Sequence, residues 1–242
     1  MANSGLSRRG PAPDPAPMMA RGRTGRLLAV LWLAVSVLTG CASTEDLEVK
    51  RLQARSAYEQ ALKSLSEKRL GLGLASLREA LLLDPDNATY HNALGVVHLD
   101  LGKAQEAQPE FARAVQLDPN YAEAHHNLGL SYAEQGKFEE AIVSYRKALS
   151  FPTYPTPEVA YHNMGNAYFF QGKLKEAQEA FTAAIQLEPK LAPAYYGLGL
   201  ALSKEGRQDE AKAAFRAARD LDPSSPFGRA AVEALKTLGE GG

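Results

Sequence analysis

The sequence predicts an all-α protein, a solenoid of stacked helix–turn–helix units that ends in a capping helix. The segment from Ala88 to Asn120 is matched by later segments when it is shifted along the chain by one unit of about 34 residues. In most copies the first amphipathic helix is predicted to end at a glycine, and the second at an acidic residue followed by proline. The single cysteine excludes an intramolecular disulfide, so we expect stacking of units to stabilise the fold.

Residues 1–40 are predicted to be a disordered leader followed by an export signal peptide. The beginning is rich in Pro, Gly, Ala and Ser, and three arginines between positions 21 and 26 precede an apolar run, Leu27–Leu38. That run is short for a bilayer-spanning helix, which needs about 20 residues, but it suits the apolar core of a signal peptide. The alternative interpretation of Leu27–Leu38 is a buried helix of a soluble protein. A start at Met18 or Met19 would give a signal peptide of conventional length.

The leader ends in Leu38-Thr39-Gly40-Cys41, which resembles the lipobox of bacterial lipoproteins. The resemblance implies that Cys41 carries an S-diacylglycerol and, after cleavage, an N-acyl chain, and no other cofactor is expected. Two or more acyl chains hold a protein stably at a bilayer. Ala42 follows, not the aspartate of lipoproteins retained at the inner membrane, so the resemblance implies the periplasmic face of the outer membrane of a Gram-negative bacterium. Residues 41–53 are read as lipidated cysteine and short tether.

Small and aromatic residues recur in register downstream. The recurring positions are Gly95, Gly129, Gly165 and Gly199; Ala107, Ala141, Ala177 and Ala211; and Phe111, Tyr145, Phe181 and Phe215. This pattern resembles the tetratricopeptide repeat, which implies a right-handed superhelical solenoid. Turn glycines are expected to end the first helices in a left-handed conformation, at Gly102, Gly136, Gly172 and Gly206. The predicted units are 54–87, 88–121, 122–157, 158–191 and 192–225, followed by a capping helix or degenerate sixth unit with a tail, 226–242.

Two departures from the repeat carry specific expectations. Pro109 lies inside a second helix, where it removes a backbone donor and is expected to kink or shorten the helix. The third unit runs two residues long through a proline-rich turn, Ser150–Pro157, that contains Phe151 and Tyr154. These aromatic rings either pack on helix ends or form a second contact point for a partner.

Charge and motif content argue against several function classes. Residues 1–40 carry a charge of +4 and the remainder −5, so no concentrated positive surface for nucleic acid is expected. His126 and His162 share one position of adjacent units, but no cysteine or carboxylate joins them at metal-ligand spacing, so no metal site is predicted. The sequence contains no nucleophile–histidine–acid signature and no phosphate-binding loop, so we expect no enzyme activity.

In the repeat family, the first helices line a concave groove through five positions of each unit. This resemblance implies that the partner-binding groove is formed by Tyr58, Leu62, Leu65, Asn92, Val96, Leu99, His126, Leu130, His162, Asn166, Phe169, Phe170, Tyr196 and Leu200, with Glu134 and Lys204 at its polar positions. Val96 and Leu99 are expected to have no role in stacking, which makes the groove unusually apolar. The leading lysine of members that bind C-terminal carboxylates is missing, so an apolar helix or strand is the expected ligand.

Lipobox, short tether and repeat array together resemble the pilotin lipoproteins of type IV pilus systems, the Tgl/PilF/PilW group. The resemblance covers residues 21–242 and implies an outer-membrane secretin as protein partner. The expected role is to localise and multimerise secretin protomers, which are captured through the groove, for type IV pilus biogenesis and twitching motility. No nucleic acid and no small-molecule substrate are expected. The alternative is a periplasmic scaffold for cell-wall hydrolases or for the β-barrel assembly machinery.

Overall fold

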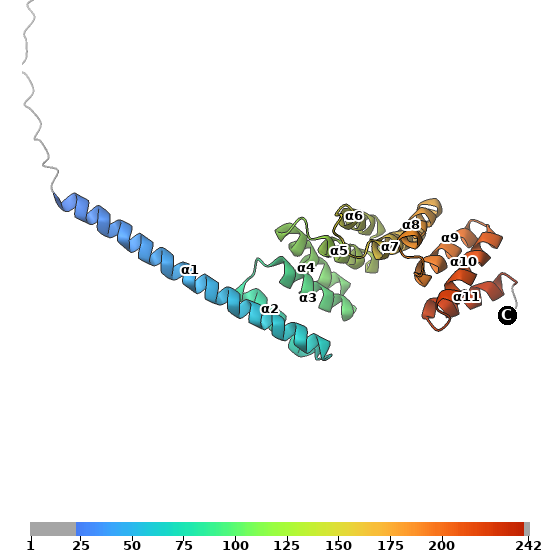
Figure 1. The fold of residues 1–242 in the computed structure, drawn as a ribbon, viewed down its shortest axis with the longest axis horizontal. Coiled ribbons are helices and arrows are strands. Elements are labelled where there is room, and N and C mark those ends of the chain that lie inside the picture. The colour runs from blue at the N-terminus through green and yellow to red at the C-terminus, as the bar shows by residue number, and fades with distance from the viewer. Residues whose placement is uncertain (1–22, 240–242) are drawn as a thin grey trace, which may run out of the picture. The chain divides into compact units, whose positions relative to one another are not determined.

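The structure is a computed structural model that describes the backbone of residues 23–239 and the side chains of residues 44–239. Between positions 23 and 239 the chain forms eleven helices and no strand, which confirms the predicted all-α solenoid (Figure 1). The helices are α1 (Arg23–Ser66), α2 (Leu70–Leu83), α3 (Ala88–Asp100), α4 (Ala104–Leu117), α5 (Ala122–Glu134), α6 (Phe138–Leu149), α7 (Pro157–Phe170), α8 (Leu174–Leu187), α9 (Ala192–Lys204), α10 (Gln208–Leu221) and α11 (Pro226–Thr237). The chain divides into two compact units, Met1–Val49 and Lys50–Gly242, and the helices from α2 onward lie in the second.

The N-terminal predictions fall largely outside the described residues. This holds for the leader up to position 22, with Met18 and Met19, and for the side chain of Cys41. The backbone from Arg23 onward belongs to α1, so the predicted tether is helical. None of the helices in the described part of the chain is both long and apolar enough to cross a membrane. The first buried side chain of α1 in the range 44–66 is Ala54, which packs in a cluster with Ala80 of α2.

The second unit is a series of antiparallel helix pairs. Consecutive helices from α2 to α11 contact one another, and the first helices also contact the next first helix along the series. Each pair turns at a left-handed residue, as Gly136 shows with φ of 72°. Just after it, the Lys137 N–H donates to the Tyr132 carbonyl at 2.9 Å, which satisfies a carbonyl at the end of α5. The first pair has Lys68 at this position, with φ of 59°.

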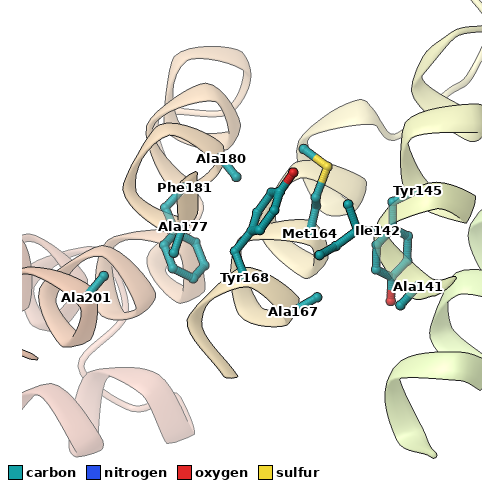
Figure 2. Close-up of a cluster of buried hydrophobic side chains, with 10 residues drawn as sticks. All are labelled: Ala141, Ile142, Tyr145, Met164, Ala167, Tyr168, Ala177, Ala180, Phe181 and Ala201. Atoms are coloured by element: carbon teal, nitrogen blue, oxygen red, sulfur yellow. The ribbon is translucent and has the colours of Figure 1, made fainter. Parts of the chain in front are cut away.

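A tight contact between a glycine and an aromatic ring holds together each pair from α3–α4 to α9–α10, and in α1–α2 the glycine contacts a leucine. A Cβ atom added to Gly129 would lie 2.6 Å from Cε1 of Tyr145, so any larger residue there displaces the ring. Such rings then contribute to clusters that extend across several pairs. Figure 2 shows one, in which Tyr145 of α6, Met164 and Tyr168 of α7, and Phe181 of α8 lie in one buried group. A single pair therefore buries only part of its own apolar surface, as stacking of units requires.

The predicted shortening at Pro109 is wrong. The helix α4 runs through it to Leu117 and spans 14 residues, the same as α8. Pro109 removes the hydrogen bond to the carbonyl of Gln105, and both residues are exposed, so water can satisfy that carbonyl. At the C-terminal end α11 packs on α9 and α10 and buries Ala231 and Leu235 in a cluster with Phe215.

Candidate interaction groove

The predicted groove residues lie on α1, α3, α5, α7 and α9, the first helices of the pairs. We call the surface that carries them the groove face; at its centre are Asn92, His126, Leu130, His162, Asn166 and Phe170. Most of its apolar side chains are half-buried, while Leu62 and Phe170 are 45% and 67% exposed. The expectation that Val96 and Leu99 have no role in stacking is wrong, because both pack against the cluster around Phe111. Leu130 and Phe169 likewise pack against the cluster of Figure 2.

A row of amide side chains begins on α3 and α5. The Asn92 Nδ2 donates to the Tyr121 hydroxyl at 3.3 Å, and the Asn127 Nδ2 donates to the Asn92 Oδ1 at 3.0 Å. Both Asn92 hydrogen-bonding atoms are thus engaged inside the protein, whereas the Oδ1 of half-buried Asn127 makes no hydrogen bond with residues 44–239. The first helices are therefore joined by polar contacts as well as apolar ones.

A second polar row connects α5 to α7. The Asn166 Nδ2 lies 3.4 Å from the His162 Nε2, the His162 Nδ1 lies 3.2 Å from the Asn163 Oδ1, and the Asn163 Nδ2 lies 3.5 Å from the His126 Nε2. All three contacts form hydrogen bonds when each imidazole is neutral and protonated at Nδ1. Burial lowers the pKa of His126 to about 4, and burial also lowers the pKa of His162, against an opposing effect of the Asn163 contact. Both rings are therefore neutral at neutral pH.

His126 is the most enclosed member of this row. Only 8% of its surface is exposed, and its ring centre lies 5.4 Å from that of Tyr145 and 5.8 Å from that of Tyr154. Its Nδ1 is buried and has no hydrogen-bond partner among residues 44–239. His126 was predicted to line the groove, and in the structure its side chain is buried beneath the groove face.

The proline-rich turn explains this burial. Tyr154 is 6% exposed, packs with Ala122, Ala148 and Ala160, and accepts a hydrogen bond at its hydroxyl from Thr156 Oγ1 at 3.1 Å. Phe151 stacks on His125, with ring centres 5.9 Å apart. Of the two interpretations, packing on helix ends is the one that the structure shows, and the two extra residues of this unit bring Tyr154 over His126.

A pocket of about 350 Å³ opens beside the second polar row. Its walls come from α5, α6 and α7: Leu130, Ala133, Glu134, Phe138, Tyr145, Asn163, Asn166, Ala167 and Phe170. Phe138 and Phe170 stack with ring centres 5.3 Å apart and planes 13° apart. This volume is near the low end of the range of ligand-binding pockets, roughly 300–1,000 Å³, and suits one large side chain of a partner. The prediction placed Leu130, Asn166 and Phe170 in the groove, and the structure brings these three together here.

Sequence reasoning missed four polar or aromatic residues of this site. Asn127 and Asn163 occupy the same position of adjacent units, one after His126 and one after His162, so their shared register was the available signal. Phe138 and Tyr145 come from a second helix, and positions on second helices were read as packing positions only. Within residues 44–239 no three histidine, cysteine or carboxylate side chains lie close enough to hold a metal ion.

Comparison with known proteins agrees with this architecture. Two models of the tetratricopeptide repeat match residues 85–153 and 162–226, which together make more than half of the chain. A search of curated proteins returned no match. The crystal structure of PilW, described as a widely conserved type IV pilus biogenesis factor, superposes with a TM-score of 0.71 at 23% identity and covers 77% of this chain and 86% of PilW.

Two further solved structures are similar. A MamA protein has a TM-score of 0.64 at 25% identity, over 71% of this chain and 92% of MamA. PilF of Pseudomonas aeruginosa has a TM-score of 0.63 at 21% identity, over 80% of this chain and 95% of PilF. At these identities the likenesses to PilW and PilF establish the fold alone. With the repeats matched in sequence and the stacked helix pairs seen in structure, the chain belongs to the tetratricopeptide-repeat family.

Proposed function

We propose that this protein is an outer-membrane pilotin, a lipoprotein that binds secretin protomers through the groove face and promotes their localisation and multimerisation for type IV pilus assembly. The observation that carries the proposal is the pocket on the groove face, bordered by half-buried amides, in a chain in which the sequence ending at Cys41 resembles a lipobox. The description of PilW as a type IV pilus biogenesis factor supports the proposed role in pilus assembly.

The groove face offers two kinds of contact to a polypeptide segment. The pocket lined by the stacked rings of Phe138 and Phe170 accepts a large side chain, and half-buried amides such as Asn127 offer hydrogen bonds to a peptide backbone. Buried anchor side chains commonly supply most of the binding free energy of an interface, and polar contacts around them fix register. The ligand we propose is therefore one short segment of the secretin, bound in an extended or helical conformation.

The lipid anchor would allow the protein to carry a bound secretin protomer to the outer membrane. Acyl chains on Cys41 hold the protein at the outer membrane, so a captured protomer is carried to the site of ring assembly. Burial of the captured segment between protomers of the growing ring would then release the pilotin for another cycle. Replacing Cys41 with Ala should move the protein from the membrane to the soluble fraction and reduce secretin multimers in the outer membrane.

The groove contact is tested by a matched pair of surface substitutions. Phe170→Lys places a charge at the pocket, and Val143→Lys makes the same change on α6 outside the pocket, at a side chain of nearly equal exposure, 67% against 66%. We expect Phe170→Lys to reduce heat-resistant secretin multimers in cells and Val143→Lys to leave them at the wild-type level. Normal secretin multimers with a folded Phe170→Lys protein would exclude the pocket as the contact.

The same pair of variants separates the pilotin from the alternative scaffold. Affinity purification from detergent-solubilised membranes should recover secretin with the wild type and the Val143→Lys variant, and less with Phe170→Lys. Recovery of cell-wall hydrolases or of β-barrel assembly subunits, without secretin and with the same dependence on Phe170, would assign the groove face to an envelope scaffold and refute the pilotin proposal.

A further inference from the structure

Three oxygen-bearing groups that line the pocket, on Glu134, Tyr145 and Asn166, have oxygen atoms that accept no hydrogen bond from residues 44–239. Glu134 is exposed at the end of α5 and forms no ion pair with residues 44–239. The two lysines on the adjoining surface are engaged elsewhere: Lys103 pairs with Glu106 at 3.2 Å, and Lys137 donates to Gln135 at 2.8 Å. Glu134 is also the last residue of α5, where the helix dipole adds negative partial charge.

Tyr145 adds a hydroxyl that its counterparts lack. The equivalent positions of the other three well-matched units hold phenylalanine: Phe111, Phe181 and Phe215. The Tyr145 ring is fully packed, it lines the pocket, and its hydroxyl makes no hydrogen bond with residues 44–239. Burial raises the pKa of this hydroxyl, and the charge of Glu134 raises it further, which places the two groups within electrostatic reach. Asn166 uses Nδ2 for His162, so its Oδ1 is also available to a ligand.

The aromatic wall faces the same space. Phe170 stacks on Phe138 and remains 67% exposed. The neighbouring Phe169 already has a cation over its ring, because Lys204 Nζ lies 5.0 Å from the ring centre. Rings of this kind attract lysine and arginine head groups within about 6 Å. The pocket thus combines an open phenyl surface, a free carboxylate and two free oxygen atoms.

We propose that this pocket binds an arginine side chain of the partner segment, an inference that rests on the proposed binding of a polypeptide by the groove face. The guanidinium is planar, stacks on aromatic rings and donates two parallel hydrogen bonds to a carboxylate, here Glu134. Its aliphatic stem packs against Leu130 and Ala167, and its remaining N–H groups reach the Tyr145 hydroxyl and Asn166 Oδ1.

Other side chains fit less well. A purely apolar side chain would cover Glu134 and the Tyr145 hydroxyl without hydrogen-bonding them, which is unfavourable. An acidic side chain or a C-terminal carboxylate would be repelled by Glu134. Lysine brings the charge but neither the planar face nor the paired donors, so arginine is preferred to it.

The test is a selection of random peptides on the purified, lipidated mature protein, which begins at Cys41, in detergent micelles. With the wild type, we expect groove-bound peptides to carry arginine at one fixed position. Glu134→Gln should remove that preference, and Glu179→Gln, an exposed carboxylate of α8 outside the pocket, should retain it. Circular dichroism melting curves confirm that the variants are folded.

Affinity of one selected peptide gives the quantitative result. By fluorescence anisotropy, replacing its arginine with methionine should weaken binding to the wild type about tenfold, a difference of about 1.4 kcal/mol, and should change binding to Glu134→Gln little. Peptides that compete at the groove face, lose affinity with Phe170→Lys and carry no fixed arginine would overturn the arginine site and leave the groove function standing. Selected peptides that bind Phe170→Lys as well as the wild type would overturn both.

Discussion

Mild acid should destabilise this protein through His126, and the variant His126→Phe should remove that effect. The ring lies between Tyr145 and Tyr154, so phenylalanine fills the same space without a titrating group. Burial holds the pKa of His126 near 4 in the folded protein, against 6.5 for the unfolded chain. Between these two values the unfolded chain binds more protons than the folded one, so stability falls as pH falls through this window.

The size of the effect follows from the shift. One pKa unit corresponds to about 1.4 kcal/mol, so the full loss between neutral pH and pH 4 is on the order of 3 kcal/mol. At pH 4.5 the loss is about 2–3 kcal/mol, because the folded ring is then only partly protonated. Below the folded pKa both states bind the proton and the stability difference stops growing. The half-buried His162 titrates in both proteins, so it cancels in the comparison with His126→Phe.

Urea unfolding of the wild type and of His126→Phe at several pH values measures this difference. The free energies of unfolding should diverge by about 2–3 kcal/mol between pH 7.5 and pH 4.5, with the wild type losing more. An NMR titration of the His126 ring gives its pKa directly. Parallel pH profiles for the two proteins, or a His126 pKa near 6.5, would refute the claim that Tyr154 and Tyr145 seal this ring from water.

Three further substitutions have expected outcomes. Tyr154→Ala should lower the free energy of unfolding by about 3–5 kcal/mol and raise the pKa of His126, measured by urea unfolding and NMR; an unchanged His126 pKa would contradict the covering role of the turn. Lys68→Gly should raise stability by about 1 kcal/mol and increase Tm by calorimetry, because Lys68 adopts φ of 59°; Lys63→Gly, inside α1, should lower Tm instead. Gly129→Ala should cost about 1–3 kcal/mol, because its Cβ would lie 2.6 Å from the Tyr145 ring; a Tm equal to the wild type would contradict that contact.

Much of the architecture was readable from the sequence because the repeat imposes a register. The predicted turn glycines Gly102, Gly136, Gly172 and Gly206 all have positive φ, from 70° to 82°. The prediction for Pro109 failed because it assumed that the carbonyl group that loses its backbone donor would have no other hydrogen-bond partner. In the structure the affected carbonyl, that of Gln105, belongs to an exposed residue near the start of α4.

The sequence predicted which helices carry the groove residues, but not how far each side chain is buried or which residues cover it. The repeat positions predicted Leu130 and Phe170 on one face, and both line the same pocket, but these positions take no account of contacts with neighbouring helices. Val96 and Leu99 are half-buried because the following pair packs on them, and His126 is buried because a turn from the same unit folds over it. Contacts of this kind depend on how adjacent units stack, which a pattern within one unit does not contain.

Site-specific photo-crosslinking in cells tests the central claim, that the groove face contacts secretin, most directly. A photoreactive residue in place of Phe170 should give a covalent adduct with the secretin, and the same residue in place of Val143 should give none. A secretin adduct from position 143 alone, or an adduct from position 170 that contains another protein and no secretin, would contradict the account.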